Sequence, residues 1–248
     1  MDIHISLAAL EIFTLAGIPI TYSMITGSIA SVCIFLVIVF LARSMAISPS
    51  GRLGSAVDSA SDWLLSLMEQ VTHDREKSIR FFPISVTIFF FVLFNNWIGL
   101  LPGVGSIHVG GIPVFRGMTA DLNATLALAV ISVVLIHVYA IRELGIVSHL
   151  KKYFSLNPVL LFIGILELVS DLSKVMSFAF RLFGNIFAGE VLLIVISALA
   201  PFAAPLPFFF LEIFVGFIQA FVFTLLTIVF FGIATGHDTV HDRKEAVV

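Results

Sequence analysis

Long stretches without a charged side chain are the feature that most restricts what this sequence can fold into. Residues 12–42 and 81–115 contain no Asp, Glu, Lys or Arg, and neither do the 20 residues between Asp121 and Arg142. A helix needs roughly 20 apolar residues to cross the hydrocarbon of a bilayer. With 59% hydrophobic and 12% charged residues, the chain is too apolar for a soluble globule of its length. We therefore predict an all-α, polytopic membrane protein with a single membrane domain over residues 1–248.

The uncharged stretches divide into about five membrane-crossing helices. Leu101-Pro102-Gly103 closes the second, and prolines between 201 and 207 split the last apolar region into two helices joined by a turn. The expected crossing helices are 20–42, 81–101, 121–142, 157–199 and 206–235. The remaining segments are an outer N-terminal segment at 1–19, a cytoplasmic surface helix at 56–80 and a cytoplasmic tail at 236–248.

The last two helices are too long to stand upright in a membrane. Pro158 to Leu199 is 42 residues, which makes a helix about 63 Å long at ~1.5 Å per residue. The hydrocarbon layer is only ~30 Å thick. We therefore expect the last two helices to be strongly tilted, so that together they form a slab that can lie against a curved neighbour.

Lys and Arg alternate between the connections, and this sets the orientation. The first and third connections and the C-terminal tail are basic, whereas the second connection holds only Arg116. This pattern predicts the N-terminus outside and the C-terminus in the cytoplasm. The first six residues contain no Lys or Arg, so we expect no cleavable signal peptide.

The first cytoplasmic connection contains an amphipathic stretch at residues 56–72. Its large apolar side chains fall near one helical face and its acidic side chains fall off that face. This pattern predicts a helix on the membrane surface. Packing of the same face on protein is an equally open alternative.

Several classes of protein are excluded by what the sequence lacks. A single cysteine, Cys33, rules out an intrachain disulfide and a CxxC metal site. No basic cluster indicates nucleic acid, and no HExxH, nucleophile elbow or P-loop indicates an enzyme that acts alone. We expect no cofactor and no bound metal, because the His and Asp residues at 237–242 fall in a tail that solvent surrounds.

Arg181 is the most demanding residue of the sequence, because it lies in a segment that is otherwise apolar enough for lipid. A guanidinium keeps its proton at physiological pH. Holding its charge at membrane depth costs at least ~2.5–3.5 kcal/mol on insertion scales. A carboxylate is its natural partner, although a purely structural role in tying helices together remains open.

Further polar residues fall on the same face of the 157–199 helix, at about 100° per residue. The residues that share this face are Glu167, Asp171, Lys174, Arg181 and Asn185. Glu190 falls on the opposite side, and in the last helix Glu212 and Gln219 share a face. Such polar residues normally face protein or water rather than lipid. One acidic group, Glu167 with Asp171, therefore precedes Arg181, and a second follows it.

These polar residues also have structural interpretations. Lys174 and Asp171, three residues apart, are suited to an ion pair near the cytoplasmic interface. Asn185 and Gln219 are suited to hydrogen bonds between helices. We interpret His137, in the third crossing helix, as a buried histidine whose hydrogen bonds are satisfied.

Five sequence segments resemble one family, subunit a of F-type ATP synthases, the stationary half of a rotary ion motor. The strongest is RLFGNIFAGE at 181–190. The others are GILELVSDLSK (164–174), FVGFIQAFVFTLL (214–226), TADLNATLAL (119–128) and NNWIGLLPG (95–103). The resemblance covers about residues 80–232. Family members differ at two positions, where this chain has Glu190 and Glu212 and some members have histidine.

The resemblance implies a proton-translocating subunit with two offset half-channels against a ring of c subunits. It implies that Arg181 faces the ring carboxylate and separates the two half-channels. The outer half-channel would be lined by Asp121, Asn123, Asn185, Glu190, Glu212 and Gln219. The inner half-channel would be lined by Glu167, Ser170 and Asp171.

The same resemblance implies the partners and the location. The partners would be the c-ring, subunit b of the peripheral stalk, the rest of the ATP synthase complex and the lipid bilayer. ATP chemistry would belong to other subunits, so this chain would be non-catalytic. A bacterial plasma (inner) membrane is expected, with an organellar energy-transducing membrane as the alternative. A Na⁺-translocating version, a stand-alone ion antiporter and a structural subunit without an ion path remain as alternatives.

Overall fold

The computed structural model describes nine parts of the chain: residues 11–15, 18–47, 52–101, 108–109, 112–113, 117–151, 153, 158–200 and 204–236. Its helices are α1 (Tyr22–Ile47), α2 (Arg52–Thr72), α3 (Arg75–Ile98), α4 (Leu122–Leu144), α5 (Ile146–Lys151), α6 (Pro158–Leu199) and α7 (Pro205–Thr235). A short 3-10 helix, η1 (Met118–Ala120), precedes α4. The antiparallel strand pairs are β1 (Glu11–Leu15) with β2 (Ile18–Thr21), and β3 (His108–Val109) with β4 (Ile112–Pro113).

The helices confirm the prediction of an all-α, polytopic membrane protein. Within the described residues, α3, α4, α6 and α7 are long and apolar enough to cross a membrane. α1 carries a shorter apolar run, Tyr22–Val37. Two small strand pairs were not foreseen. The first occupies part of the expected N-terminal segment, where β1 pairs with β2 directly before α1.

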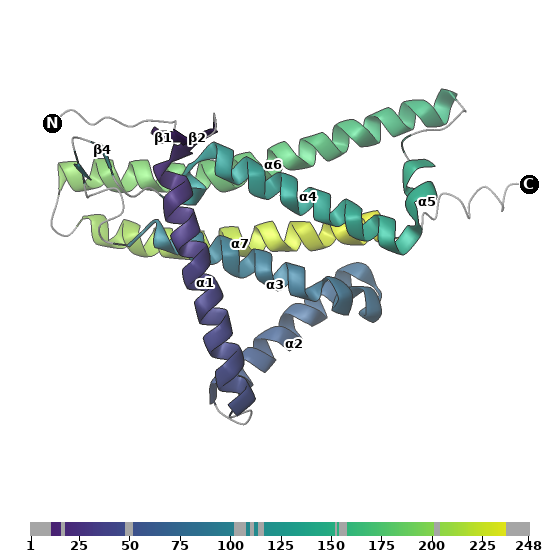
Figure 1. The fold of residues 1–248 in the computed structure, drawn as a ribbon, viewed down its shortest axis with the longest axis horizontal. Coiled ribbons are helices and arrows are strands. Elements are labelled where there is room, and N and C mark those ends of the chain that lie inside the picture. The colour runs from purple at the N-terminus through teal and green to yellow at the C-terminus, as the bar shows by residue number, and fades with distance from the viewer. Residues whose placement is uncertain are drawn as a thin grey trace, which may run out of the picture.

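The long helices pack as neighbours along their lengths. α4 lies along α6, α3 lies along α7, and α6 and α7 contact each other (Figure 1). In the same view α1 runs steeply across these four helices, and α2 extends from the far end of α1 back toward α3 (Figure 1). α6 keeps all 42 residues of the expected helix without a break. Its length is about twice the thickness of the hydrocarbon layer, so it fits within that layer only if it is strongly tilted.

The connection between α1 and α3 differs from the single surface helix expected at 56–80. α2 ends at Thr72, and His73 adopts a left-handed backbone conformation with φ 52°. Asp74 then caps α3, because its side chain accepts hydrogen bonds from the backbone N–H groups of Glu76 and Lys77. Residues 75–80 therefore belong to α3.

The apolar face of α2 packs on protein, which was the alternative left open for this stretch. Met68 is fully buried in a cluster with Phe81 of α3 and Phe231 of α7. The rings of Phe81 and Phe231 stack with their centroids 4.0 Å apart. Leu64 and Val71 pack against the same cluster. The apolar periodicity of α2 therefore indicates contact with α3 and α7.

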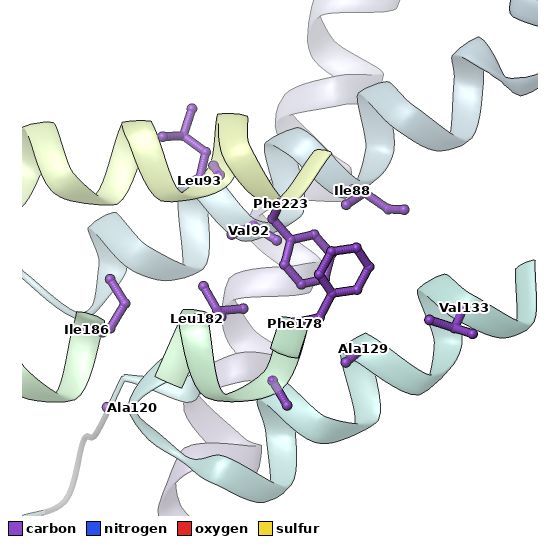
Figure 2. Close-up of a cluster of buried hydrophobic side chains, with 12 residues drawn as sticks. Ile88, Val92, Leu93, Ala120, Ala129, Val133, Phe178, Leu182, Ile186 and Phe223 are labelled. Carbon is purple, nitrogen blue, oxygen red and sulfur yellow. The ribbon is translucent and has the colours of Figure 1, made fainter. Parts of the chain in front are cut away.

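The main core lies where α3, α4, α6 and α7 meet (Figure 2). Phe178 of α6 and Phe223 of α7 stack at its centre, with ring centroids 4.7 Å apart. Lipid offers apolar side chains the same surroundings as a core does, so membrane helices associate mainly through close packing and polar contacts. This packing fixes the rotation of α6 three residues before Arg181.

Two side chains of α3 fix the rotation of α7. Asn96 Nδ2 donates to the backbone carbonyl of Gly216 at 3.0 Å, and Trp97 Nε1 donates to that of Ile213 at 3.1 Å. Gly216 allows this approach, because a Cβ there would lie 3.3 Å from the Asn96 Cβ. With α7 held by these two hydrogen bonds, its neighbouring face is directed at α6. That face carries Glu212 and Gln219.

Candidate functional site

Arg181 sits at the edge between the packed face and the exposed face of α6. Its neighbour Leu182 is fully buried in the core, whereas Phe180 is 54% exposed. Arg181 Nη2 donates to Ser177 Oγ at 3.1 Å. The other terminal nitrogen, Nη1, is buried, and no described residue accepts a hydrogen bond from it. Arg181 as a whole is only partly buried, so its side chain is not fully enclosed by the described residues.

Glu212 of α7 carries a buried carboxyl group that lies against α6. Its side chain is buried, and its carboxyl atoms occupy the space that a Cβ on Gly189 would need. Glu212 Oε1 has no hydrogen-bond partner among the residues that the structure describes. A buried carboxyl group at membrane depth without a cation beside it indicates a functional site. The glycine at 189, which the sequence analysis did not single out for this role, makes the approach possible.

Asn185 and Gln219 join α6 to α7 near this carboxyl group. Asn185 Nδ2 donates to Gln219 Oε1 at 2.7 Å, which confirms a hydrogen bond between the helices. Gln219 Nε2 is buried and finds no acceptor within the described part of the chain. Glu190 is half-buried and directly follows Gly189. Of the six residues expected for the outer half-channel, the α6–α7 contact thus brings Asn185, Glu212 and Gln219 together.

Asp121 and Asn123 lie at the start of α4, in a separate polar contact. Asp121 is buried, and its Oδ1 accepts from the backbone N–H of Asn123 at 3.0 Å, so that it caps α4. Its Oδ2 accepts a short hydrogen bond from Ser23 Oγ, and Ser23 in turn shares a hydrogen bond with Thr21. Asp121 therefore links α4 to the start of α1, and the Asn123 side chain is exposed. Sequence reasoning missed Ser23, which lies 98 residues away.

The acidic group that precedes Arg181 is compensated by a cation. Lys174 Nζ donates to Asp171 Oδ1 at 2.7 Å and lies 4.0 Å from Glu167 Oε1. The ion pair between Lys174 and Asp171 that the sequence suggested is therefore confirmed. Ser170, on the same turn, is exposed.

Tyr153 is a further partner of Asp171 that sequence reasoning missed. Its hydroxyl donates to Asp171 Oδ2 at 2.7 Å, from the connection between α5 and α6. Burial, followed by the hydrogen bond to the Asp171 carboxylate, raises the pKa of the Tyr153 hydroxyl above its usual range. The hydroxyl therefore stays protonated at neutral pH and remains a hydrogen-bond donor.

These groups follow one another along α6. Lys174 precedes Arg181 by seven residues and Glu190 follows it by nine, which corresponds to about 10 Å and about 14 Å along the axis. A fixed positive charge at Arg181 therefore has polar side chains on both sides along the axis of α6. In the described parts of the chain no group of three or more His, Cys, Asp or Glu could hold a metal ion. The His and Asp residues at 237–242 lie outside the described residues.

Comparison with known proteins gives a consistent result over most of the chain. A family model described as ATP synthase A chain matches residues 23–232. A protein of Campylobacter jejuni subsp. doylei named ATP synthase subunit a is 37% identical over 219 residues, which cover 87% of this chain and 90% of that protein. A protein of the same name from Moorella thermoacetica is 32% identical over 221 residues, covering 89% and 93%. Another from Syntrophobacter fumaroxidans is 38% identical over 161 residues, covering 63% and 61%.

Proposed function

The chain belongs to the ATP synthase A chain family, and on that premise we propose that it carries protons across the membrane through two offset half-channels. As subunit a it is a multi-pass membrane protein of the ATP synthase complex. The observation that carries the proposal is the position of Arg181. Its partly buried guanidinium lies along α6 between Asp171, which pairs with Lys174, and Gly189, against which the Glu212 carboxyl group of α7 is buried.

The positive charge of Arg181 acts on a carboxyl group that a ring of c subunits brings past it. A nearby cation stabilises the ionised form of an acid. The ring carboxyl group therefore gives up its proton as it approaches Arg181, into the inner half-channel. Glu167, Ser170 and Asp171 line that side and pass the proton to the cytoplasm.

The next step takes place on the other side of Arg181. The ionised ring carboxylate moves on and takes a proton from the outer half-channel, lined by Asp121, Asn123, Asn185, Glu190, Glu212 and Gln219. Once neutral, the group can enter lipid at far lower cost than a charge could. Each charge that crosses 100 mV carries ~2.3 kcal/mol, so several crossings are summed through rotation for each ATP.

Arginine suits this position better than lysine. Its charge persists under burial, whereas a buried lysine readily loses its proton. A permanent charge at residue 181 also prevents a proton from passing directly between the two half-channels. The exposed apolar face of α6 beside Arg181, which includes Phe180 and Met176, is the face offered to the ring.

The remaining parts of the proposal concern partners and location. The c-ring contacts the slab formed by α6 and α7, and subunit b of the peripheral stalk holds the chain stationary. The host membrane is a bacterial plasma membrane, with the N-terminus outside and the C-terminus in the cytoplasm. This orientation places Lys174, with Asp171 and Glu167, on the cytoplasmic side.

Replacement of Arg181 by alanine tests the proposal in the assembled complex. We expect Arg181→Ala to abolish ATP synthesis and ATP-driven proton pumping, while the amount of assembled complex stays that of the wild type. Arg142→Ala is the matched control, because Arg142 is exposed on α4, with its guanidinium 5.5 Å from the centroid of the Tyr139 ring. Coupled activity retained in Arg181→Ala would contradict the role of Arg181. Ion exchange by the chain reconstituted alone would instead indicate an antiporter.

A further inference from the structure

A cluster of titratable side chains lies at the inner end of α6, and the proposed function uses only part of it. His137 comes from α4, His149 from α5 and Tyr153 from the connection that follows. α6 contributes Lys174 and Asp171, with Glu167 beside them. We call this set the inner cluster. Its histidines and its tyrosine have no place in the two half-channels described above.

Asp171 is the centre of the inner cluster. Its Oδ1 accepts from Lys174 Nζ and its Oδ2 from the Tyr153 hydroxyl, each at 2.7 Å. The same Oδ2 lies 3.7 Å from His137 Nε2, which is ion-pair distance when the imidazole is protonated. The two histidine rings lie edge to face with centroids 5.4 Å apart. One carboxylate thus joins α4, α6 and the α5–α6 connection.

The surroundings of Asp171 are held in place by close packing. The Tyr153 carbonyl lies against Gly164, in the space that a Cβ would need, so the connection passes directly over α6. His149 is buried, and its ring meets that of Tyr153 with centroids 5.5 Å apart. The Lys174 ammonium lies 5.1 Å from the centroid of the Phe230 ring of α7.

Histidine is the residue type of the inner cluster that ordinarily changes charge near neutral pH, and His137 is a histidine whose Nε2 lies 3.7 Å from Asp171 Oδ2. The unperturbed imidazole titrates around pH ~6.5, whereas Asp, Glu and Lys titrate far from neutrality. With His137 neutral, Glu167 and Asp171 outweigh Lys174 by one negative charge. A proton on His137 balances that charge. His137 also borders a small pocket between α4, α6 and α7 that Asp171 and Lys174 line with it.

We propose that His137 exchanges protons between the inner half-channel and the cytoplasm. In this proposal Tyr153 and Lys174 position Asp171 so that its carboxylate stabilises the protonated imidazole of His137. The inference rests on the proposed function. A proton released toward Glu167 passes to the imidazole, which gives it to water on the cytoplasmic side, and the reverse transfers occur during pumping. Tyr153 is a positioning residue in this scheme, because it acts through Asp171.

Among the described residues, titratable groups face His137 from α6 and from α5. α6 supplies Asp171 and Lys174, with Glu167 beyond them, and α5 supplies His149. The side chains that α7 contributes to the pocket, those of Phe230, Ile233 and Ala234, do not titrate. A pH dependence that disappears with His137 therefore reports this cluster.

ATP-driven pumping by the whole complex in inverted vesicles tests the inference, because the cytoplasmic face is then exposed to the medium. The rate of His137→Gln is divided by that of the wild type while the medium is varied from about pH 5.5 to about pH 8.5, around the imidazole pKa. This ratio cancels the pH dependence of the catalytic subunits. We expect about a fivefold deficit at the acidic end of this range and a ratio that rises toward one at the alkaline end, because histidine is the side chain whose charge ordinarily changes within it.

Three further variants ensure that the test does not depend on correct folding of the His137→Gln variant alone. Tyr153→Phe keeps the ring but removes the hydroxyl, and it should give a smaller deficit with the same pH dependence. Tyr139→Phe removes a hydroxyl near the end of α4, outside the inner cluster, and should give a flat ratio near one. His73→Asn removes an exposed histidine at a left-handed position that asparagine tolerates, and it should also give a flat ratio.

Flat ratios for both His137→Gln and Tyr153→Phe across this range would overturn the inference. If Arg181→Ala has lost coupling in the same preparations, the proposed function stands and only the role of His137 falls. If Arg181→Ala retains coupling, the proposed function fails and the inference falls with it. A pH profile measured from the vesicle lumen should not differ between His137→Gln and the wild type, and a difference there would also count against the inference.

Discussion

The buried carboxyl groups on the two sides of Arg181 differ in whether a cation lies beside them. In the inner half, Asp171 receives hydrogen bonds from Lys174 and Tyr153, so the carboxylate is compensated within the chain. In the outer half, Glu212 lies buried against Gly189, with no cation beside it among the described residues. The neighbouring Asn185 and Gln219 are neutral. Within the described residues, a cation therefore compensates the Asp171 carboxylate, whereas none lies beside the Glu212 carboxyl group.

This difference indicates which groups are structural and which are available to another molecule. Breaking a compensated pair leaves a buried charge, which is costly, but neutralising both members together is often tolerated. Among the described residues no cation lies beside the Glu212 carboxyl group, and the contact given for the Arg181 guanidinium is with the neutral hydroxyl of Ser177. Under the proposed function, Arg181 and Glu212 are thus the groups that a ring carboxyl group and its proton would engage. Substitutions on the two sides of Arg181 should therefore differ in how far they lower ATP synthesis, from the largest loss to the smallest.

The largest effect is expected from removing both carboxyl groups of the outer half. Glu190→Gln with Glu212→Gln keeps the shapes but removes the groups that bind protons there. We expect ATP synthesis to fall by about 10²-fold or more, since a positioned proton-transfer group contributes about 10²–10⁴-fold. The measurement is ATP synthesis by reconstituted complex under an imposed proton gradient. The control is the double replacement Glu69→Gln and Glu143→Gln, whose carboxylates pair with Arg75 and Arg80. An unchanged rate in the outer variant would place the outer pathway elsewhere.

A smaller effect is expected when the outer carboxyl group is displaced rather than removed. In Gly189→Ala the new Cβ collides with the Glu212 carboxyl group, which must move away from α6. We expect ATP synthesis to fall by about tenfold, because misplacing a reacting group by about 1 Å can cost 10²-fold. Glu212→Asp, which is shorter by one methylene, should restore part of the rate in the Gly189→Ala background.

Gly184→Ala separates this collision from the general effect of alanine in a helix. Both substitutions raise helix propensity by about 1 kcal/mol, but a Cβ at Gly184 meets no described atom within 4 Å. The detergent-solubilised subunit with Gly184→Ala should therefore be at least as stable as the wild type, and that with Gly189→Ala less stable. Equal thermal stability of the two variants would show that Glu212 does not occupy the space beside Gly189.

The helices and the isolated charge of Arg181 in an apolar segment could be predicted from sequence because both depend on local composition. An uncharged run of membrane length, a 42-residue helix and a single guanidinium in an apolar segment are visible without any tertiary contact. The break between α2 and α3 also had a local signal, since Asp74 is a typical capping residue before a helix. The 56–80 prediction overlooked that signal.

The contacts of Ser23 and Tyr153 could not be predicted, because they join segments that only folding brings together. Ser23 meets Asp121 across 98 residues, and Tyr153 meets Asp171 from a connection without periodicity. His137 was interpreted as a buried histidine, but the structure leaves it partly exposed, with its Nε2 3.7 Å from Asp171 Oδ2. A helical wheel gives the face of a residue on its own helix but not the residues on the neighbouring helix. Polar contacts within one element were therefore predictable here, and those between elements mostly were not.

The smallest effect is expected from neutralising the compensated pair of the inner half. Lys174→Gln with Asp171→Asn removes two opposite charges together and keeps polar groups that can accept from Tyr153. Because such a replacement is often nearly neutral, we expect the stability of the solubilised subunit to change by less than about 1 kcal/mol. ATP synthesis should fall by less than about tenfold, since Glu167 and His137 remain to exchange protons. Lys174→Gln alone should be more damaging to stability than the double variant, because it leaves Asp171 without its cation. If the inner double variant lowers synthesis as much as the outer one, the two halves of α6 do not differ in the way their charges are compensated.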